Sequence, residues 1–269
     1  MNNRPVIIKG KRRILSQEQN KATVPHRATQ RVLSILDLLA QAKESLTFSE
    51  IQKSLNIPKS SLSPILHTMV NAEYVQSNEA DATYSVGIHA FMAGKAFERS
   101  NDDLTMLRRV MQGIVDKTNE TCQVGILDHN KVLYLVRIDS PQVIRLVSSP
   151  GYLLPAYCTA IGKVLISEWS DERLKELGPE PYDRYTDRTI TTREALSEEL
   201  EKVREYGIAR DRSEMTKGVQ CIAVSLKVQG SIKYGLGLTV PDYRLTDEKL
   251  QEFKQVLKDA QTQLEAMLI

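Results

Sequence analysis

The stretch FSEIQKSLNIPKSSLSPILHTMV, residues 48–70, decides the fold of the first part of the chain. Its beginning predicts a helix, because Thr47 and Glu50 have the spacing of a capping box. The segment NIP at 56–58 ends this helix, and a further helix is expected over 59–71. Each helix has one apolar face, formed by Ile51 and Leu55 in the first and by Leu62, Ile65, Leu66, Met69 and Val70 in the second. Two helices joined by so short a turn indicate a helix-turn-helix.

The flanking segments extend this pattern to a winged helix-turn-helix domain over 27–87. A helix is predicted over 27–42, where apolar residues recur with a 3.6-residue period. Its apolar face consists of Val32, Ile35, Leu36 and Leu39. Two β-prone runs, 74–76 and 83–86, enclose the polar turn 78–81 and predict a hairpin, the wing. Such a domain sets its last helix into the major groove of DNA and its wing against the backbone. A small helical domain of another kind is the alternative.

The charge of the chain is segregated, although its formal net charge is only +2. Residues 1–27 hold seven Lys and Arg against one Glu, which gives +6, so the rest of the chain sums to −4. A basic end on an acidic body suggests contact with a polyanion, and a solvated tail is the alternative. We expect residues 1–26 to form a flexible basic arm in front of the DNA-binding domain.

The composition excludes several classes of protein. Hydrophobic residues make up 41% of the 269 residues, which is enough for a folded core. No apolar run approaches the roughly 18–20 residues that a membrane span needs, and no secretory signal follows the charged N-terminus. Cys122, Cys158 and Cys221 are far apart and form no CxxC pair, so neither a zinc site nor a disulfide framework is expected. We expect a cytoplasmic protein without metal or cofactor.

The second part of the chain predicts a linker helix and then an α+β domain. The linker is expected over 88–103, with a helix over 88–99 that has an apolar stripe of Ile88, Phe91, Met92 and Ala96. This stripe suits contact with a second copy of the chain, or it packs on its own domain. The domain over 104–269 has strands predicted at 122–127, 132–138, 144–147, 221–228 and 232–240, and helices at 104–118, 159–167, 171–177, 193–206 and 247–268.

The motifs favour a binding pocket over an active site. The sequence has no phosphate-binding loop, dinucleotide fingerprint, HExxH or GxSxG motif, and its four histidines are scattered. The loop that begins at Pro150 enters a helix whose first amides, those of Ala160 and Ile161, can hold an anion, with Thr159 as the cap. Asp211 is expected in a polar loop before the strand of Cys221. An ordinary capped helix and a turn residue are the alternatives.

Eight short segments, in this order, resemble the IclR family of transcriptional regulators. They are RVLSIL (31–36), LNIPKSSL (55–62), YSVG (84–87), IHAFMAG (88–94), YCTAIGK (157–163), YGIARD (206–211), GVQCIAV (218–224) and GLTVP (237–241) followed by RLT. The resemblance implies a winged helix-turn-helix, a linker helix and a GAF-like effector-binding domain. It also implies a dimer or a dimer of dimers on an operator, and a small metabolite as effector, often a carboxylic acid. By position, the effector pocket would include Ala160, Ile161, Asp211, Cys221, Gly237 and Thr239.

Two positions depart from the pattern of the family. Gly237 stands beside Thr239 where the family often has two hydroxyl residues, so we expect one polar contact fewer and a larger pocket. Pro64 stands where a basic residue is common, so the helix either begins late with Ser63 as its cap or is kinked. A recognition helix this poor in Arg predicts shape readout and reliance on the basic arm. The residues expected to contact DNA are Arg27, Arg31, Thr47, Lys59, Ser60, Ser61, Ser63 and His67.

The sequence therefore predicts a DNA-binding transcriptional regulator, with repressor as the commoner choice. Its partners would be a double-stranded operator, a carboxylate effector and a second copy of the chain. Two alternatives remain open at this point. One is a hydrolase on a GAF-like fold that uses Cys221 as its nucleophile, and the other is a DNA-tethered assembly protein with an empty pocket.

Overall fold

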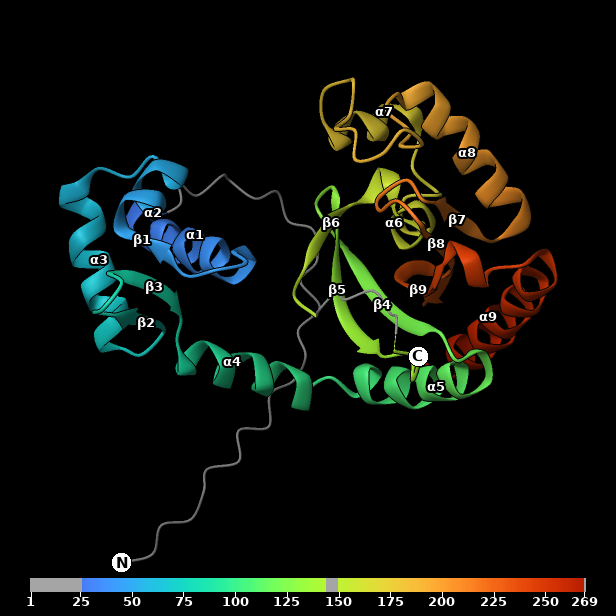
Figure 1. Cartoon of the computed structure of the whole chain (residues 1–269), viewed down its shortest axis with the longest axis horizontal. Helices are drawn as coiled ribbons and strands as arrows, with labels where there is room; N and C mark the ends of the chain where they lie inside the picture. The colour runs from blue at the N-terminus through green and yellow to red at the C-terminus, as the bar shows by residue number, and fades with distance from the viewer. Residues whose placement is uncertain (1–25, 144–149, 269) are drawn as a thin grey trace, which may run out of the picture.

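The computed structural model describes residues 26–143 and 150–268. They form two lobes joined through one exposed helix, as Figure 1 shows. Residues 1–25 of the predicted arm, and the strand predicted over 144–147, lie outside the described residues. Within the described residues, no helix is long and apolar enough to cross a membrane.

The N-terminal lobe is the predicted winged helix. Its helices are α1 (Arg27–Gln41), α2 (Phe48–Leu55) and α3 (Lys59–Asn71), and its strands are β1 (Leu46–Thr47), β2 (Val75–Asn78) and β3 (Thr83–Val86). The helices enclose a core in which Ile35, Ile51 and Leu62 are fully buried. The two-residue strand β1 was not predicted, because it is too short to show a period, and it pairs antiparallel with β3. The wing is therefore a three-stranded sheet in the order β1-β3-β2.

Local signals define the helix-turn-helix as expected. The hydroxyl of Thr47 accepts a hydrogen bond from the amide of Glu50 at 3.3 Å, and the Glu50 carboxylate accepts one from the amide of Thr47 at 2.7 Å. This reciprocal pair is the predicted capping box. Asn56 ends α2 in the left-handed conformation, which Asn tolerates better than most residues. Local signals thus fix both ends of α2, and its end at Asn56 begins the turn to α3.

The linker helix α4 (Ile88–Arg99) is anchored to the N-terminal lobe at its first turn. The amide of Gly87 donates to the carbonyl of Tyr74 at 2.8 Å, and the His89 ring donates to the carbonyl of Ala72 at 2.8 Å. A Cβ at Gly87 would lie 2.2 Å from the carbonyl oxygen of Glu73, so this approach requires glycine. We conclude that α4 is attached to the N-terminal lobe.

The C-terminal lobe is built on one antiparallel sheet in the order β6-β5-β4-β9-β8-β7. Its strands are β4 (Thr121–Asp128), β5 (Lys131–Ile138), β6 (Leu153–Pro155), β7 (Ala209–Arg212), β8 (Val219–Val228) and β9 (Ser231–Pro241). Its α-helices are α5 (Asp102–Thr118), α6 (Ala160–Leu165), α7 (Asp171–Leu174), α8 (Arg193–Tyr206) and α9 (Asp247–Met267), with short 3₁₀ turns at Ala156–Cys158, Lys175–Leu177 and Asp242–Arg244. The short strands β6 and β7 were not predicted.

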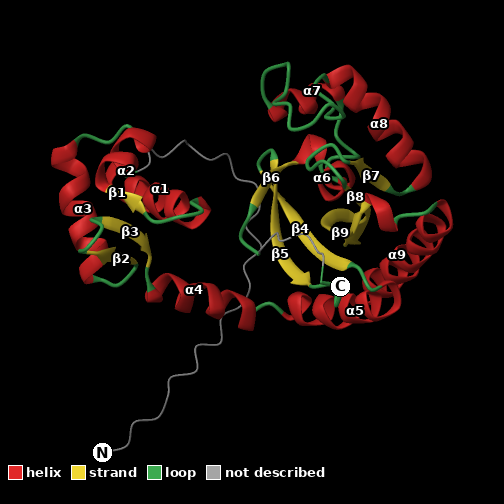
Figure 2. Ribbon diagram, viewed as in Figure 1, coloured by secondary structure: helices red, strands yellow, loops and turns green. Residues whose placement is uncertain are grey.

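Helices cover both faces of this sheet, as Figure 2 shows. One face packs on α5 and α9 through a core that includes Leu107, Ile222 and Leu257. The other face packs on α6, α7 and α8 through a core that includes Ile161, Leu196 and Ala223. The predicted α+β class is confirmed, and this second face is where the expected effector residues lie.

Candidate effector site and DNA-binding surface

Three of the expected effector residues form a row across neighbouring strands. Asp211 on β7 is paired with Cys221 on β8, and Cys221 is paired with Thr239 on β9. Residues paired in this way lie on the same face of a sheet. The Cys221 sulfur lies 3.5 Å from the Thr239 hydroxyl, which donates to the side-chain oxygen of Gln123 on β4 at 3.3 Å. We call Asp211, Cys221, Thr239 and Gln123 the polar row.

Helix α6 points its first turn at the same face of the sheet. The Thr159 hydroxyl accepts a hydrogen bond from the amide of Gly162 at 3.1 Å, which confirms the predicted cap. The first amides of a helix, here those of Ala160 and Ile161, have no partner within the helix, and they carry its positive dipole end. The structure thus brings both predicted amides and the polar row to one face of one sheet.

The expectation that Gly237 enlarges the pocket is wrong. A Cβ at Gly237 would lie 3.1 Å from the side chain of Ile161 and 3.0 Å from the carbonyl oxygen of Ile222. At Gly235 a Cβ would come within 2.8 Å of the same Ile161 side chain. Ile161 therefore fills the space that a hydroxyl residue would occupy, and glycine at 237 compensates for the bulk of isoleucine at 161.

Asp211 lies on strand β7 and not in the polar loop that was expected. Its side chain is 2% exposed and accepts a hydrogen bond from the amide of Glu214 at 2.5 Å. Burial raises the pKa of Asp211 to about 7, and the charge of Glu214 adds to the rise, while hydrogen bonds from the amides of Glu214 and Met215 and the charge of Lys163 oppose it. A carboxyl group in this state can donate a proton to a ligand oxygen near neutral pH.

A buried ion triad fixes the end of β7 against α6. Lys163 is fully buried, and its ammonium group donates to Glu214 at 2.6 Å and to the carbonyl of Arg210 at 2.9 Å. Glu199 on α8 lies 3.7 Å from the same ammonium group and also accepts from Arg212 at 2.8 Å. The triad of Lys163, Glu214 and Glu199 therefore positions Asp211. Residue-by-residue analysis of the sequence missed it, because nothing local marks Lys163 as buried.

The three cysteines are in a state that does not favour nucleophilic attack. Burial is the largest cause that raises the pKa of Cys122, Cys158 and Cys221 far above the ordinary value. The negative charge of Asp211 raises the pKa of Cys158 and Cys221 further. Their thiols stay protonated, whereas a cysteine nucleophile reacts as a thiolate. Within residues 26–143 and 150–268, no group of three or more His, Cys, Asp or Glu could hold a metal ion.

The candidate DNA-binding surface is the exposed side of α3. Lys59, Ser60, Ser63 and His67 are exposed there, whereas Ser61 is half-buried. Asn71, which the sequence analysis did not select, follows His67 by one helical turn and contacts its ring at 3.3 Å. The helical period would have placed Asn71 on this surface, and an Asn amide is suited to read adenine.

Pro64 does not delay the start of α3, so the expectation of a Ser63 cap is wrong. The helix begins at Lys59 with Pro58 as its N-cap and contains Pro64 in its second turn. Proline there removes one backbone hydrogen bond, and the Thr68 hydroxyl donates to the Pro64 carbonyl at 2.8 Å. Arg27 and Arg31 lie on α1, and the hydroxyl of Thr47 is engaged in the cap of α2.

The wing does not supply cations. Residues 74–87 contain no Lys or Arg, and the turn at its tip carries Glu79 and Asp81. Asn78 holds that turn by donating to Asp81 at 2.9 Å and by accepting from the amide of Ala80 at 3.0 Å. Two carboxylates at the tip disfavour contact with phosphates, so binding energy must come from elsewhere.

Comparison with known proteins assigns the chain to one family. The IclR helix-turn-helix domain matches residues 28–79, and the bacterial transcriptional regulator IclR C-terminal domain matches residues 100–266. The HTH-type transcriptional regulator KdgR of Escherichia coli (strain K12) is 33% identical over 242 residues, which are 88% of this chain and 91% of that protein. The chain belongs to the IclR family of transcriptional regulators.

Solved structures of the IclR family share the fold. The crystal structure of an IclR transcriptional regulator from Alicyclobacillus acidocaldarius has a TM-score of 0.82 and 21% identity, and covers 90% of this chain and 99% of its own. That of an IclR homologue from Microbacterium hydrocarbonoxydans, complexed with 4-hydroxybenzoate, has a TM-score of 0.73 and 21% identity, and covers 90% and 98%.

Membership in the IclR family confirms the prediction of a DNA-binding transcriptional regulator with a C-terminal effector domain. The matched relatives are regulators and not enzymes, so the comparisons do not support the cysteine-dependent hydrolase.

Proposed function

We propose that this regulator is a repressor whose operator binding is controlled by a small organic acid at the polar row. The observation that carries the proposal is the juxtaposition of Asp211, Cys221 and Thr239 with the first amides of α6. The amides of Ala160 and Ile161 would hold the carboxylate, and Asp211 and Thr239 would bond a neighbouring oxygen. The relative that binds 4-hydroxybenzoate supports a carboxylate as the ligand class.

Ligand entry would require movement, because three of the four side chains of the row are buried and Cys221 is half-buried. Asp211, Gln123 and Thr239 are each less than a tenth exposed, and Ile161 packs directly on Gly235 and Gly237. A ligand that binds between α6 and the sheet must therefore displace Ile161 or separate the two elements. A protein state with this space open would bind the effector more tightly than the closed state, which is the condition for a shift in population.

Strand β9 would carry the change to the linker. Gly237 and Thr239 lie toward one end of β9, and Lys233 and Tyr234 lie toward the other. Both of the latter donate to the Asp103 carboxylate at 2.7 Å, which fixes the first turn of α5 to the sheet. Since α4 is attached to the DNA-binding lobe, the break at Ser100 and Asn101 is where the two lobes would turn relative to each other.

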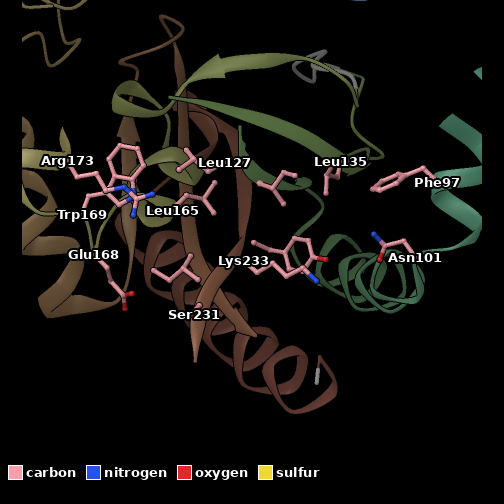
Figure 3. Close-up of a pocket in the computed structure, with 13 residues that line it drawn as sticks. Phe97, Asn101, Leu127, Leu135, Leu165, Glu168, Trp169, Arg173, Ser231 and Lys233 are labelled. Atoms are coloured by element: carbon pink, nitrogen blue, oxygen red, sulfur yellow. The ribbon is translucent and has the colours of Figure 1, made fainter. Parts of the chain in front are cut away.

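Figure 3 shows the space in which this turn would occur. Phe97 and Asn101 lie on one side of a cleft of about 700 Å³, and Leu135, Lys233 and Trp169 line it from the effector domain. Phe97 is 53% exposed, so the end of α4 is not held by close packing on this domain. We predict that Asp103→Asn leaves effector binding intact but reduces its effect on operator affinity by about threefold or more. An unchanged effector response in this variant, measured by fluorescence anisotropy, would refute the role of β9.

The linker helix would also form the dimer. Ile88, Phe91 and Met92 are each more than half exposed on one side of α4, where no residue is buried. An exposed apolar stripe of this kind suits a second copy of the chain, as a homodimer or a dimer of dimers. Two DNA-binding lobes would then contact paired half-sites. Sedimentation of Phe91→Glu, which should be monomeric, tests this arrangement.

DNA contact would rest on α3 and the N-terminal arm, in the cytoplasm, where bacterial operators are. Lys59 and the basic residues of 1–27 would neutralise phosphates, and His67, Ser60 and Ser63 would approach base edges. The residues Arg27, Arg31, Thr47 and Ser61 would support this contact from the flanks. Deletion of residues 2–24 should lower operator affinity and flatten its salt dependence, and an unchanged salt slope would exclude the arm. Repression would follow from occupancy of the operator alone, because the bound regulator would prevent other proteins from binding the same DNA.

The division of the chain into arm (1–26), winged helix (27–87), linker (88–103) and effector domain (104–269) is part of this proposal. The whole proposal is tested by selecting the genomic fragments that the purified protein binds. Anisotropy titrations of operator binding in the presence of organic and sugar acids then follow. We expect one acid to raise the melting temperature and to change operator affinity. Operator binding without any responsive acid would favour the assembly protein with an empty pocket.

A further inference from the structure

A second concave surface is lined by α8, α9 and the segment of β7. These elements lie at one edge of the sheet, as Figure 1 shows. It is a groove of about 410 Å³, which is within the size range of small-ligand sites. Each helix contributes one face at helical spacing. The lining residues are Glu199, Lys202, Val203 and Tyr206 from α8, and Gln251, Lys254, Gln255 and Lys258 from α9, with Ile208, Arg210 and Arg212 from the segment of β7.

The groove gathers positive charge in an acidic part of the chain. Five cations line it, from Lys202, Arg210, Arg212, Lys254 and Lys258, against the single carboxylate of Glu199. That carboxylate is already engaged by Lys163 and Arg212. The exposed acids of both helices do not line the groove; they are Glu194, Glu198, Glu201, Glu205, Asp247, Glu248, Glu252 and Asp259. Charge is thus sorted by helix face.

Several of these cations have no partner of their own. Among residues 26–143 and 150–268, no carboxylate forms an ion pair with Lys202, Lys254 or Lys258. The Nε of Arg210 is buried and has no hydrogen-bond partner in the described part of the chain. Burial and the neighbouring Arg212 lower the pKa of Arg210, while Asp247 and Glu199 oppose this effect. The guanidinium group of Arg210 is half-buried and therefore partly desolvated, which is costly, and an anion would offset that cost. Lys202 and Lys258 are exposed and add positive charge at the rim.

We propose that the groove between α8 and α9 is a second ligand site, which takes a small molecule with two or more closely spaced negative charges. Phosphate esters and di- or tricarboxylates share this chemistry. Arg210, whose guanidinium group is held by a hydrogen bond to Gln220 at 2.6 Å, would bind the anion directly, and Lys254 and Lys258 would neutralise it. The flanking acids would repel a long polyanion, which favours a small ligand over DNA.

Calorimetric titration of the full-length protein with inorganic pyrophosphate and with citrate tests the proposal, with acetate at equal ionic strength as the reference. We expect at least one of the two to bind with Kd below about 1 mM and acetate not to bind. Binding of pyrophosphate alone identifies phosphate ligands, and binding of citrate alone identifies polycarboxylates.

The variant K254Q/K258Q should bind the anion more weakly, with a Kd raised by about tenfold or more. The matched control K117Q/K249Q removes the same charge from exposed sites outside the groove and should keep Kd within about twofold. Equal weakening in both variants, or no binding of either anion, overturns the proposal. So does a selective loss of affinity for random-sequence DNA in K254Q/K258Q without anion binding, because the groove would then be a DNA contact.

Discussion

The polar row and the exposed side of α3 use polar residues in opposite ways. Three members of the row are buried and Cys221 is half-buried, and these groups are already hydrogen-bonded, as Asp211 is to the amide of Glu214 and Thr239 to Gln123. On α3, Lys59, Ser63 and His67 are exposed to solvent. On the proposed function, a ligand would reach the row only by changing the structure, whereas DNA would meet a surface that is already formed. This difference is what a regulator requires.

The largest effect on stability is expected at the triad of Lys163, Glu214 and Glu199, which positions Asp211 in the row. Lys163→Met leaves Glu214 and Glu199 buried without their shared cation, and should lower the free energy of unfolding by about 3–5 kcal/mol. Urea denaturation measures this loss. Lys249→Met, at an exposed site on α9, is the control and should stay within about 0.5 kcal/mol. A loss below about 1 kcal/mol for Lys163→Met would mean that the triad does not stabilise the row.

The proton on Asp211 should make stability depend on pH. The carboxyl ionises near 3.8 when unfolded and near 7 in the fold, so the folded state holds one proton more between these values. The free energy of unfolding should therefore fall as pH rises from about 4 to about 7, by roughly 3 kcal/mol, and then level off. Asp211→Asn should lack this decline in urea melts at pH 5, 6, 7 and 8. If the free energy of unfolding varied with pH in the same way in both proteins, the raised pKa of Asp211 would be contradicted.

Operator binding should be weakened separately from effector binding by a substitution at Gly87, where α4 is anchored to the N-terminal lobe. Gly87→Ala places a Cβ against the Glu73 carbonyl, and should cost about 1–3 kcal/mol and weaken operator binding, with effector binding unchanged. Gly94→Ala in the same helix meets open space, and should raise stability by about 0.5–1 kcal/mol. Anisotropy with operator DNA and thermal shifts with effector measure the two sides. Equal behaviour of the two variants would argue against a fixed anchor.

The smallest effect should come from the contact that closes the row. Gly237→Ala places its Cβ 3.1 Å from the Cγ1 atom of Ile161 and should cost about 1 kcal/mol, and it should cost less in an Ile161→Ala background, which lacks that Cγ1 atom. Ile161→Ala alone is the reference protein for this comparison. The double-mutant cycle therefore predicts a favourable coupling between the two substitutions. Simple additivity would show that the two side chains do not compete for one space.

Elements that span several turns or alternations were predictable from the sequence. The bounds of α4 and α8 agree with the predicted ranges, and α5 begins two residues earlier than expected, at Asp102. The strands β1, β6 and β7 were missed, since two to four residues carry too little periodicity to identify. The helix predicted over 59–71 is confirmed as α3, and of the two alternatives at Pro64 the late start at Ser63 is wrong, because packing of Leu62 and Leu66 supports the helix through Pro64.

The site was predictable as a set of positions but not as an arrangement. Family motifs named Asp211, Cys221 and Thr239, and strand register brings the three together. Gln123 was missed, although a polar residue within an apolar strand was a usable signal. The contact of Ile161 with Gly237 and the burial of Lys163 depend on how α6 meets the sheet, which joins residues more than 45 positions apart. No local pattern carries that information.

The four-residue strand β7 has one further consequence, which concerns its register. Side chains alternate along a strand, so Asp211 faces the polar row while Arg210 and Arg212 face away from it. A slip by a single residue would exchange them, and would place a guanidinium group at the position of Asp211 in the polar row. The Lys163 bond to the Arg210 carbonyl and the Glu214 amide on Asp211 both oppose that slip. The same two bonds thus keep opposite charges on opposite sides of one short edge strand.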